Sequence, residues 1–282
     1  MQKTSKHIVA ASAVLTAALA CTTAHAVVIA DFQVITEANY TSDSSINGRA
    51  FIGGDLNGSP SIAQSLTQPL GTVGLYVGGN INGTPNVNGD AVVTGTGTVN
   101  FNPPFSSGGG QLFNGPIPTD VIPEVSLISD TLADLSANSS VSQSGQTFTF
   151  NAAPDANGVA VFDVGEAVLE TQNGNLQLNA NNADLVVINV AGTAIDQAGG
   201  VNINFPNSAG AFVIFNFVDA TTLNISSSFR GSIVAPLATV TGDASNVGSL
   251  AAFQVDSNGQ QTLPSFGFAT APEGPDAEVA LV

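Results

Sequence analysis

Three short segments place carboxylate and amide oxygens close together in the sequence, as calcium sites do. They run over residues 155–158, 243–246 and 256–259, and each starts with an aspartate followed by an asparagine within three residues. The same pattern is typical of Asx turns. None of the three has the terminal glutamate of an EF-hand loop or the nonapeptide repeat of calcium-binding β-rolls, so Asx turns are the favoured interpretation. The candidate calcium ligands are Asp155, Asn157, Asp243, Asp256 and Asn258.

Two arginines are the candidates for a ligand clamp or for the base of a polysaccharide lyase. Arg49 and Arg230 each stand beside a glycine in a phrase that recurs along the chain. The favoured interpretation is again structural. Because a lone arginine in an acidic protein usually finds a carboxylate, we expect each of them to form an ion pair.

The composition excludes several classes of enzyme and predicts a non-enzymatic protein. Both histidines, both lysines and the only cysteine lie within residues 1–26, which leaves two arginines against 21 acidic residues, a formal charge of −19 (2 − 21). Triads, thiol catalysis, Schiff bases and zinc sites are therefore excluded. A carboxylate pair, or an arginine with calcium, is the catalytic machinery that remains. The negative charge also excludes nucleic acid as a partner.

The first 26 residues are typical of a secretory signal peptide. Two lysines precede an apolar run over residues 8–20, which is too short to span a bilayer, and small residues lead up to Ala26. We expect cleavage between Ala26 and Val27, so that the mature protein is secreted. The alternative is a lipoprotein signal that is cut before Cys21 and acylated there, but the residues upstream of Cys21 fit it poorly.

Short strands and glycine-rich turns recur along the chain. A phrase made of a turn and an apolar strand begins at Ile46, Val87, Phe229 and Val247. Spacings of 18 residues (247 − 229) and 41 residues (87 − 46) are close to one and two coils of a β-solenoid, in which each coil buries its apolar side against its neighbours. We predict a mostly β protein with a right-handed β-solenoid, or β-helix, and a β-sandwich as the alternative.

One segment has the apolar periodicity of a helix. Asp120 stands where an N-cap belongs, and we expect an amphipathic helix over about residues 120–137. Its single apolar stripe requires burial against the β body. One β-rich domain is expected over residues 27–268, followed by an acidic disordered tail over residues 269–282. The stripe consists of Val121, Val125, Ile128, Leu132 and Leu135.

Two further sets of side chains suggest a binding surface or a pocket. Thr94, Thr96 and Thr98 would share one face of a strand, as in an ice- or glycan-binding surface, but no equivalent row one coil away is evident, so a solvated strand edge is favoured. A set of phenylalanines could line a pocket, yet interior stacking is the favoured interpretation. These are Phe148, Phe150, Phe162, Phe205, Phe212, Phe215 and Phe217.

Several segments resemble the choice-of-anchor A family of bacterial adhesive domains, and the resemblance covers about residues 30–268. It implies a surface-displayed, solenoidal adhesive domain whose helix corresponds to residues 120–137. The family is named for its varied C-terminal sorting signals. Here residues 271–274 are similar to the opening of such a signal, but the apolar span and arginine cluster that should follow are missing, so we expect no anchor. The matching segments are residues 31–34, 45–54, 75–80, 87–89, 215–225 and 229–240.

The sequence therefore predicts a secreted adhesive or structural protein of a bacterial cell surface or extracellular matrix, with no cofactor and no transmembrane segment in its mature form. The expected partner is a glycan, a surface or matrix protein, or another copy of the chain. Retention at a surface would come from glycan contact or from edge-to-edge association of terminal coils. Two alternatives stay open: a carbohydrate-active enzyme, acting as lyase or hydrolase on a β-helix scaffold, and an ice- or glycan-binding protein.

Overall fold

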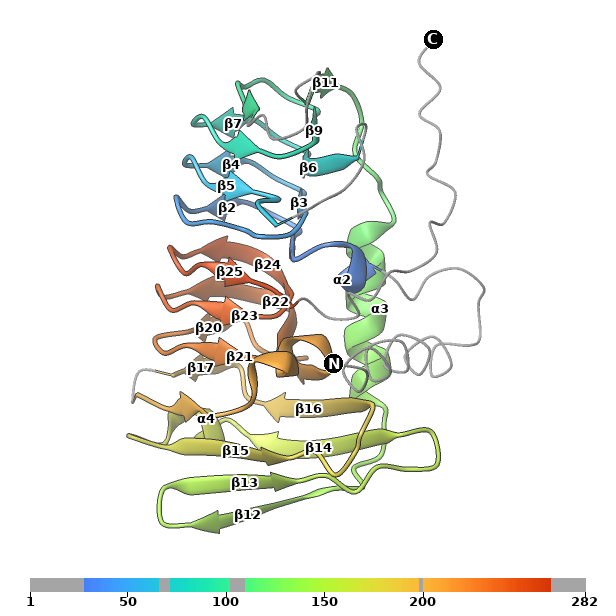
Figure 1. The fold of residues 1–282 in the computed structure, drawn as a ribbon, viewed down its shortest axis with the longest axis vertical. Helices are drawn as coiled ribbons and strands as arrows, with labels where there is room; N and C mark the ends of the chain where they lie inside the picture. The colour runs from blue at the N-terminus through green and yellow to red at the C-terminus, as the bar shows by residue number, and fades with distance from the viewer. Residues whose placement is uncertain (1–27, 66–71, 102–109, 198–199, 265–282) are drawn as a thin grey trace.

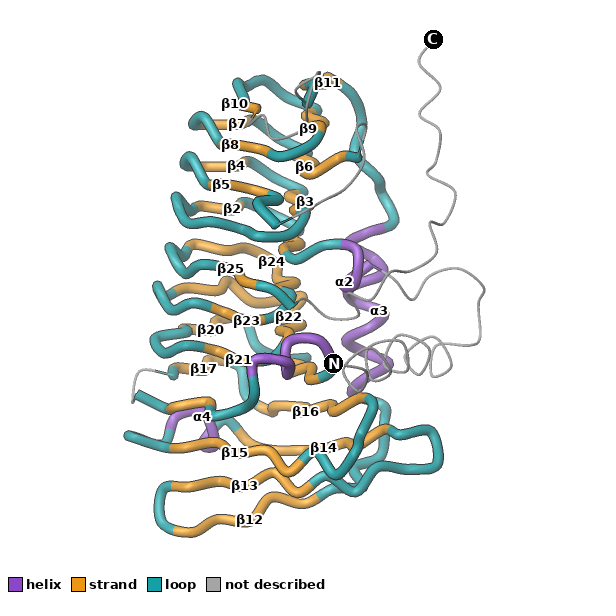
Figure 2. The backbone as a smooth tube through the Cα atoms, in the orientation of Figure 1, coloured by secondary structure: helices purple, strands orange, loops and turns teal. Residues whose placement is uncertain are grey.

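The computed structural model describes residues 28–65, 72–101, 110–197 and 200–264 (Figure 1). In this part of the chain the protein is mostly β, with short strands separated by turns and loops (Figure 2). No helix among the described residues is long and apolar enough to cross a lipid bilayer. The expected cleavage site between Ala26 and Val27 and the whole of the expected tail lie outside the described residues.

The largest sheet contains a path of parallel strands that stack along the length of the molecule (Figure 1). The path has a free edge at each end, so the sheet does not close on itself. In stacking order the strands are β11 (Leu112–Asn114), β9 (Asp90–Val93), β6 (Val73–Val77), β3 (Ala50–Ile52), β1 (Val34–Thr36), β24 (Leu250–Asp256), β22 (Ser232–Thr241), β19 (Val213–Asn216), β16 (Leu185–Ala191) and β14 (Val159–Gly165).

Most circuits of the chain add one strand to this path and then short strands to two further sets. The second set lies beside the far ends of β22 and β24 and contains β7 (Ile81–Asn82), β4 (Leu56–Asn57), β2 (Tyr40–Thr41), β20 (Thr222–Asn224) and β17 (Ala194–Asp196). The third set contains β10 (Asn100–Phe101), β8 (Asn86–Val87), β5 (Ser61–Ile62), β25 (Gln261–Thr262), β23 (Asn246–Val247) and β21 (Phe229–Arg230).

The remaining elements lie at one end of the stack or on its flank (Figure 1). A separate sheet contains β12 (Ser140–Ser144), β13 (Thr147–Asn151), β15 (Asn175–Asn179) and β18 (Asn202–Ile203). The helices are α2 (Val28–Asp31), α3 (Val121–Ala133), α4 (Ala167–Glu170) and the 3-10 helix η1 (Asn207–Ala211).

The order of the strands in space does not follow their order in the chain. The chain begins at β1 in the middle of the stack and builds toward β11 at one end. Helix α3 then runs along the stack toward the opposite end, where β12 to β14 begin the return (Figure 1). The last strand of the return, β24, pairs in parallel with β1, and Leu250 lies opposite Val34. We call this junction of the first and last circuits the seam.

Helix α3 covers the outer side of the largest sheet. All five residues of its predicted apolar stripe are buried or partly buried, and they pack on apolar side chains of β1, β14, β16, β19 and β22. The predicted helix on the β body is therefore confirmed. It is shorter than predicted, because it ends at Ala133. Asp120 occupies the N-cap position, but its side chain makes no capping hydrogen bond.

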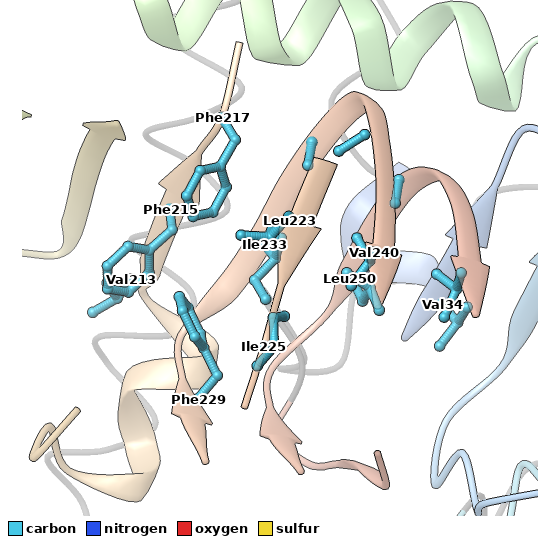
Figure 3. Close-up of a cluster of buried hydrophobic side chains, with 14 of the residues drawn as sticks. Val34, Val213, Phe215, Phe217, Leu223, Ile225, Phe229, Ile233, Val240 and Leu250 are labelled. Carbon is cyan, nitrogen blue, oxygen red and sulfur yellow. The ribbon is translucent and has the colours of Figure 1, made fainter. Parts of the chain in front are cut away.

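The interior of the stack is filled by side chains from all three sets of strands. Figure 3 shows Val213 and Phe215 of β19 close to Phe229 of β21. The ring of Phe215 meets the ring of Phe229 edge to face at 4.7 Å between centroids, and the ring of Phe205 lies 5.9 Å away. Of the seven phenylalanines expected inside, six are buried and Phe212 packs partly buried against them. Interior stacking, and not a pocket, is confirmed for this set.

The recurring phrase marks successive circuits, with one correction. Ile46 and Val87 lie two circuits apart, as predicted, with β5 between them. Phe229, however, pairs with Asn246 and not with Val247. The circuit there is 17 residues long, as the hydrogen bond between the equivalent serines Ser232 and Ser249 shows.

The prediction of a mostly β fold is confirmed, with large parallel sheets. The β-sandwich alternative expects antiparallel sheets. Among the described strands, only β12 and β13 pair antiparallel. The parallel arrangement therefore disagrees with the sandwich.

Candidate binding face

One side of the stack carries polar side chains in register on seven adjacent strands. In each strand the preceding residue is apolar, points inward and is buried, so alternation turns the polar residue outward. Adjacent strands lie about 4.8 Å apart, which makes the row about 29 Å long. We call these residues the outer row. In stacking order they are Asp196, Asn224, Thr241, Asp256, Thr41, Asn57 and Asn82.

Side-chain hydrogen bonds run along the outer row. Asn82 Nδ2 donates to Asn57 Oδ1 at 2.9 Å, and Asn57 Nδ2 donates to Thr41 Oγ1 at 3.3 Å. Near the other end, Asn224 Nδ2 donates to Asp196 Oδ1 at 2.8 Å. Because an amide held in this way has a fixed orientation, the row presents an ordered series of donors and acceptors to the solvent.

Two ladders of side-chain-to-backbone hydrogen bonds connect the corners of successive circuits, one on each side of the outer row. In each ladder a side-chain oxygen accepts the backbone N–H of the equivalent residue in the next circuit, at 2.6 to 3.2 Å. These bonds satisfy corner N–H groups that the strands cannot reach. We call them the corner ladders. The first contains Asp243, Asn258, Asp43, Ser59 and Thr84, and the second contains Asn39, Asp55, Asn80 and Thr96.

The five candidate calcium ligands fall into three different roles. Asp243 and Asn258 belong to a corner ladder, and Asp256 belongs to the outer row. Asp155 forms an Asx turn in which its Oδ1 accepts the N–H groups of Asn157 at 2.8 Å and Val159 at 2.9 Å. These bonds, that of Val159 first, hold the pKa of Asp155 below its ordinary value. The structure therefore does not gather the five residues, and the described part of the chain has no group of three or more His, Cys, Asp or Glu side chains that could hold a metal ion.

Comparison with models of known protein families shows to which family the chain belongs. Residues 26–263 match the family model described as "Putative Ice-binding-like adhesive domain". The chain belongs to this family. No curated protein and no solved structure matches it.

The two arginines of this ice-binding-like adhesive domain occupy different places and bind backbone carbonyls. Arg49 Nε donates to the carbonyl of Val73 at 2.8 Å, and its guanidinium lies 4.8 Å from the ring centroid of Phe32. Arg230 Nη1 donates to the carbonyl of Phe205 at 2.7 Å. Each bond joins neighbouring circuits, so both arginines connect parts of the stack. The positive charge of Arg49 also opposes the rise that loss of solvation causes in the pKa of Asp31.

The proposed threonine row does not exist as predicted. Strand β9 ends at Val93, so Thr94 lies at a corner and not in the strand. Thr96 is the last member of a corner ladder, where its N–H and hydroxyl both donate to Asn80 Oδ1 at 3.0 Å. The chain bends at Thr94 and Gly95, and at both Gly95 and Gly97 it passes so close to the neighbouring circuit that an added Cβ would collide with it. Thr98 is exposed beyond this turn.

Sequence reasoning missed the outer row of this family member. The row mixes aspartate, asparagine and threonine. Except across the seam, its members on neighbouring strands are 15, 16, 17, 25 or 28 residues apart, so no fixed period reveals it. A signal was present nonetheless. In six of the seven strands, a polar residue, a large apolar residue and a second polar residue follow one another, as in residues 39–41, 55–57 and 80–82.

Proposed function

We propose that the chain is a secreted, non-enzymatic adhesive or matrix protein of a bacterial cell surface, and that the outer row is its binding face. The register of polar side chains on seven adjacent strands carries the proposal. Helix α3 covers a different side of the stack and leaves this one open. The adhesive description of the family supports the same function.

The proposal includes a finer description of the fold. The stacked circuits form a right-handed β-solenoid, because crossover connections between parallel strands of one sheet are right-handed in nearly all proteins. Within the ice-binding-like adhesive family, the resemblance to choice-of-anchor A domains supports a protein displayed at a surface. The signal peptide pattern supports secretion.

An extended glycan fits the outer row best. Sugar hydroxyls both donate and accept hydrogen bonds, and the row offers amide, hydroxyl and carboxylate groups along about 29 Å. The acidic charge of the chain favours a neutral or cationic glycan. Anionic surfaces would repel the protein at low salt, and added salt or divalent cations would reduce that repulsion.

Ice is the second candidate ligand. A flat array for ice requires polar groups repeated on successive circuits, and the outer row has that repetition. The family description names ice-binding-like domains. Thermal hysteresis and inhibition of ice recrystallisation separate this function from glycan binding.

A bulky side chain in the middle of the outer row tests the binding face. Thr241 is exposed, and Thr241→Tyr would hold an extended ligand away from the neighbouring strands. We expect at least tenfold weaker binding to the glycan found on an array. The matched control is Gln177→Tyr on β15, which is also exposed but lies outside the outer row. Equal binding by the two variants would contradict the proposed face.

Two further measurements test the rest of the proposal. Release of reducing ends or unsaturated products from polysaccharides, with or without calcium, would show that the protein is an enzyme. Fractionation of a producing culture should find a chain that begins at Val27 in the medium or on the cell surface. Acyl chains on Cys21 would show that the lipoprotein alternative is correct.

A further inference from the structure

Strand β12 is the outermost strand at its end of the molecule (Figure 1). It pairs with β13 on one side and is the terminal member of its sheet. An edge strand of this kind exposes backbone N–H and C=O groups that another strand can pair with.

Strand β14 is also an edge strand, at the end of the largest sheet, but residues outside the strand form hydrogen bonds with its backbone groups. The N–H groups of Asn138 and Ser139 both donate to the carbonyl of Val161, and Asn138 Oδ1 accepts the N–H of Val161 at 2.8 Å. Asn138 Nδ2 also donates to the carbonyl of Val159 at 2.9 Å. Asn138 thus takes the place of a further strand at that edge. In the described part of the chain, no strand lies beyond β12.

The hydrogen bonds of β13 identify the groups that β12 exposes. The carbonyl of Gln146 and the N–H of Ala152 bond with β15, so the even-numbered residues of this strand face β15 and the odd-numbered residues face β12. The partners of those odd-numbered residues are Ser140, Ser142 and Ser144. Because bonding alternates along an antiparallel strand, the N–H and C=O groups of Val141 and Gln143 point away from β13.

The strand lacks the features that usually protect an edge. Residues 135–154 contain no lysine, arginine, aspartate or glutamate, and β12 contains no proline or bulge. Its serine and glutamine side chains are exposed, and Val141 is half-buried. In a chain with a formal charge of −17, this is a place where two copies can meet without like charges on the contacting strands.

We propose that β12 pairs antiparallel with β12 of a second copy, which forms a two-fold symmetric dimer. One register pairs the exposed N–H and C=O groups of both Val141 and Gln143 on each strand. In this register Val141 lies opposite Gln143 of the other copy, and Ser142 lies opposite Ser142. The same strand meets itself, as an isologous interface requires. The dimer would carry two outer rows, so it would bind a repetitive ligand more tightly than a monomer does. The interface does not depend on what the outer row binds.

Sedimentation of the secreted, processed chain over a range of concentrations tests the dimer. Gln143→Glu places like charges on the two strands, and we expect it to weaken dimerisation at least tenfold without changing the melting temperature. The matched control is Gln177→Glu, which adds the same charge at an exposed position of β15 and should leave dimerisation unchanged. A wild-type chain that stays monomeric, or oligomers that both variants affect equally, would overturn the proposal.

Single cysteines test the register, since the chain from residue 27 onward has no cysteine of its own. Residues opposite each other in a non-hydrogen-bonded pair have Cα atoms about 4.5 Å apart, within the range of a disulfide. Ser142→Cys should therefore form a disulfide-linked dimer under mild oxidation. Ser140→Cys should not, because it lies opposite Ser144 of the other copy. Equal cross-linking by the two variants would overturn the proposed register, and cross-linking by neither would overturn the interface.

Discussion

The two halves of the stack are held together by different interactions. In the N-terminal half, from β1 to β9, the interior is mainly aliphatic, with residues such as Leu75 and Val87. In the C-terminal half, phenylalanine rings form a connected series with centroids 4.7 to 6.5 Å apart. The strands differ as well, since β14 and β16 have seven residues each and β3 has three.

The corner ladders show what the N-terminal half uses in addition. The side chains of Asp43, Asp55 and Asn80 accept backbone N–H groups from the next circuit there. A short strand with an aliphatic interior buries less apolar area than a longer one with aromatic rings, and burial contributes roughly in proportion to that area. Side-chain hydrogen bonds at the corners compensate for part of the stabilisation that this smaller burial does not provide. Narrow circuits therefore depend for their stability more on hydrogen bonds at their corners, and wide circuits more on apolar side chains buried in their interior.

The largest effect should come from the aromatic interior. Phe215 is buried against Phe205, Phe217 and Phe229, so Phe215→Ala should lower the free energy of unfolding by about 3–5 kcal/mol. The matched change in the N-terminal half, Leu75→Ala, should lower it by about 2–4 kcal/mol. Denaturant unfolding measures both. If Leu75→Ala lowered the free energy of unfolding more than Phe215→Ala does, the aliphatic interior of the N-terminal half would be the more important of the two.

The seam is where the two halves meet, and Gln33 joins them. Its Oε1 accepts the N–H of Gly48 from the N-terminal half, and its Nε2 donates to the carbonyl of Gly248 from the C-terminal half at 3.5 Å. Gln33→Leu leaves the buried N–H of Gly48 without this acceptor, which should lower the free energy of unfolding by about 1–3 kcal/mol. Gln64→Leu, at an exposed glutamine, is the control and should change little. An unfolding curve with two steps in Gln33→Leu would show that the halves are separate cooperative units.

Local patterns predicted the elements better than their arrangement. The helical stripe and the interior phenylalanines followed from periodicity and hydrophobicity, which depend on nearby residues. The position of β1 beside β24 depends on α3 carrying the chain past the strands already formed, and no local residue records that. The error at Phe229 has a related cause. Arg230 and Val247 pair although their types differ, so matching by type placed the phrase one residue away from its true register.

A corner ladder gives the next smaller effect. Asp55 Oδ1 accepts the N–H of Asn80 at 2.6 Å, so Asp55→Ala removes one bond between circuits. The free energy of unfolding should fall by about 1 kcal/mol, which is typical of one hydrogen bond. Asp55→Asn keeps an acceptor at the same place and should recover at least half of the loss. Thermal or denaturant unfolding of the two variants compares them directly, and equal losses would show that the acceptor is not what stabilises this corner.

The smallest effect concerns a polar turn in the C-terminal half, at Asp155. The N–H groups of Val159 and Asn157 favour its charged form and lower its pKa in the folded protein. A carboxyl group with a lowered folded pKa stabilises the protein above its unfolded pKa, and this contribution disappears as the pH falls through the folded value. Asp155→Asn keeps the oxygen acceptor but cannot titrate. Wild type should therefore be slightly more stable than Asp155→Asn near neutral pH. The difference should begin to shrink as the pH falls below about 4, the ordinary pKa of aspartate, and should vanish only below the lowered pKa of the folded protein. Because Asp155 is exposed, solvent screens its charge and keeps the difference small. A difference between the two proteins that is constant with pH would mean that the turn depends on its geometry alone, as the corner ladders do where asparagine or serine replaces aspartate.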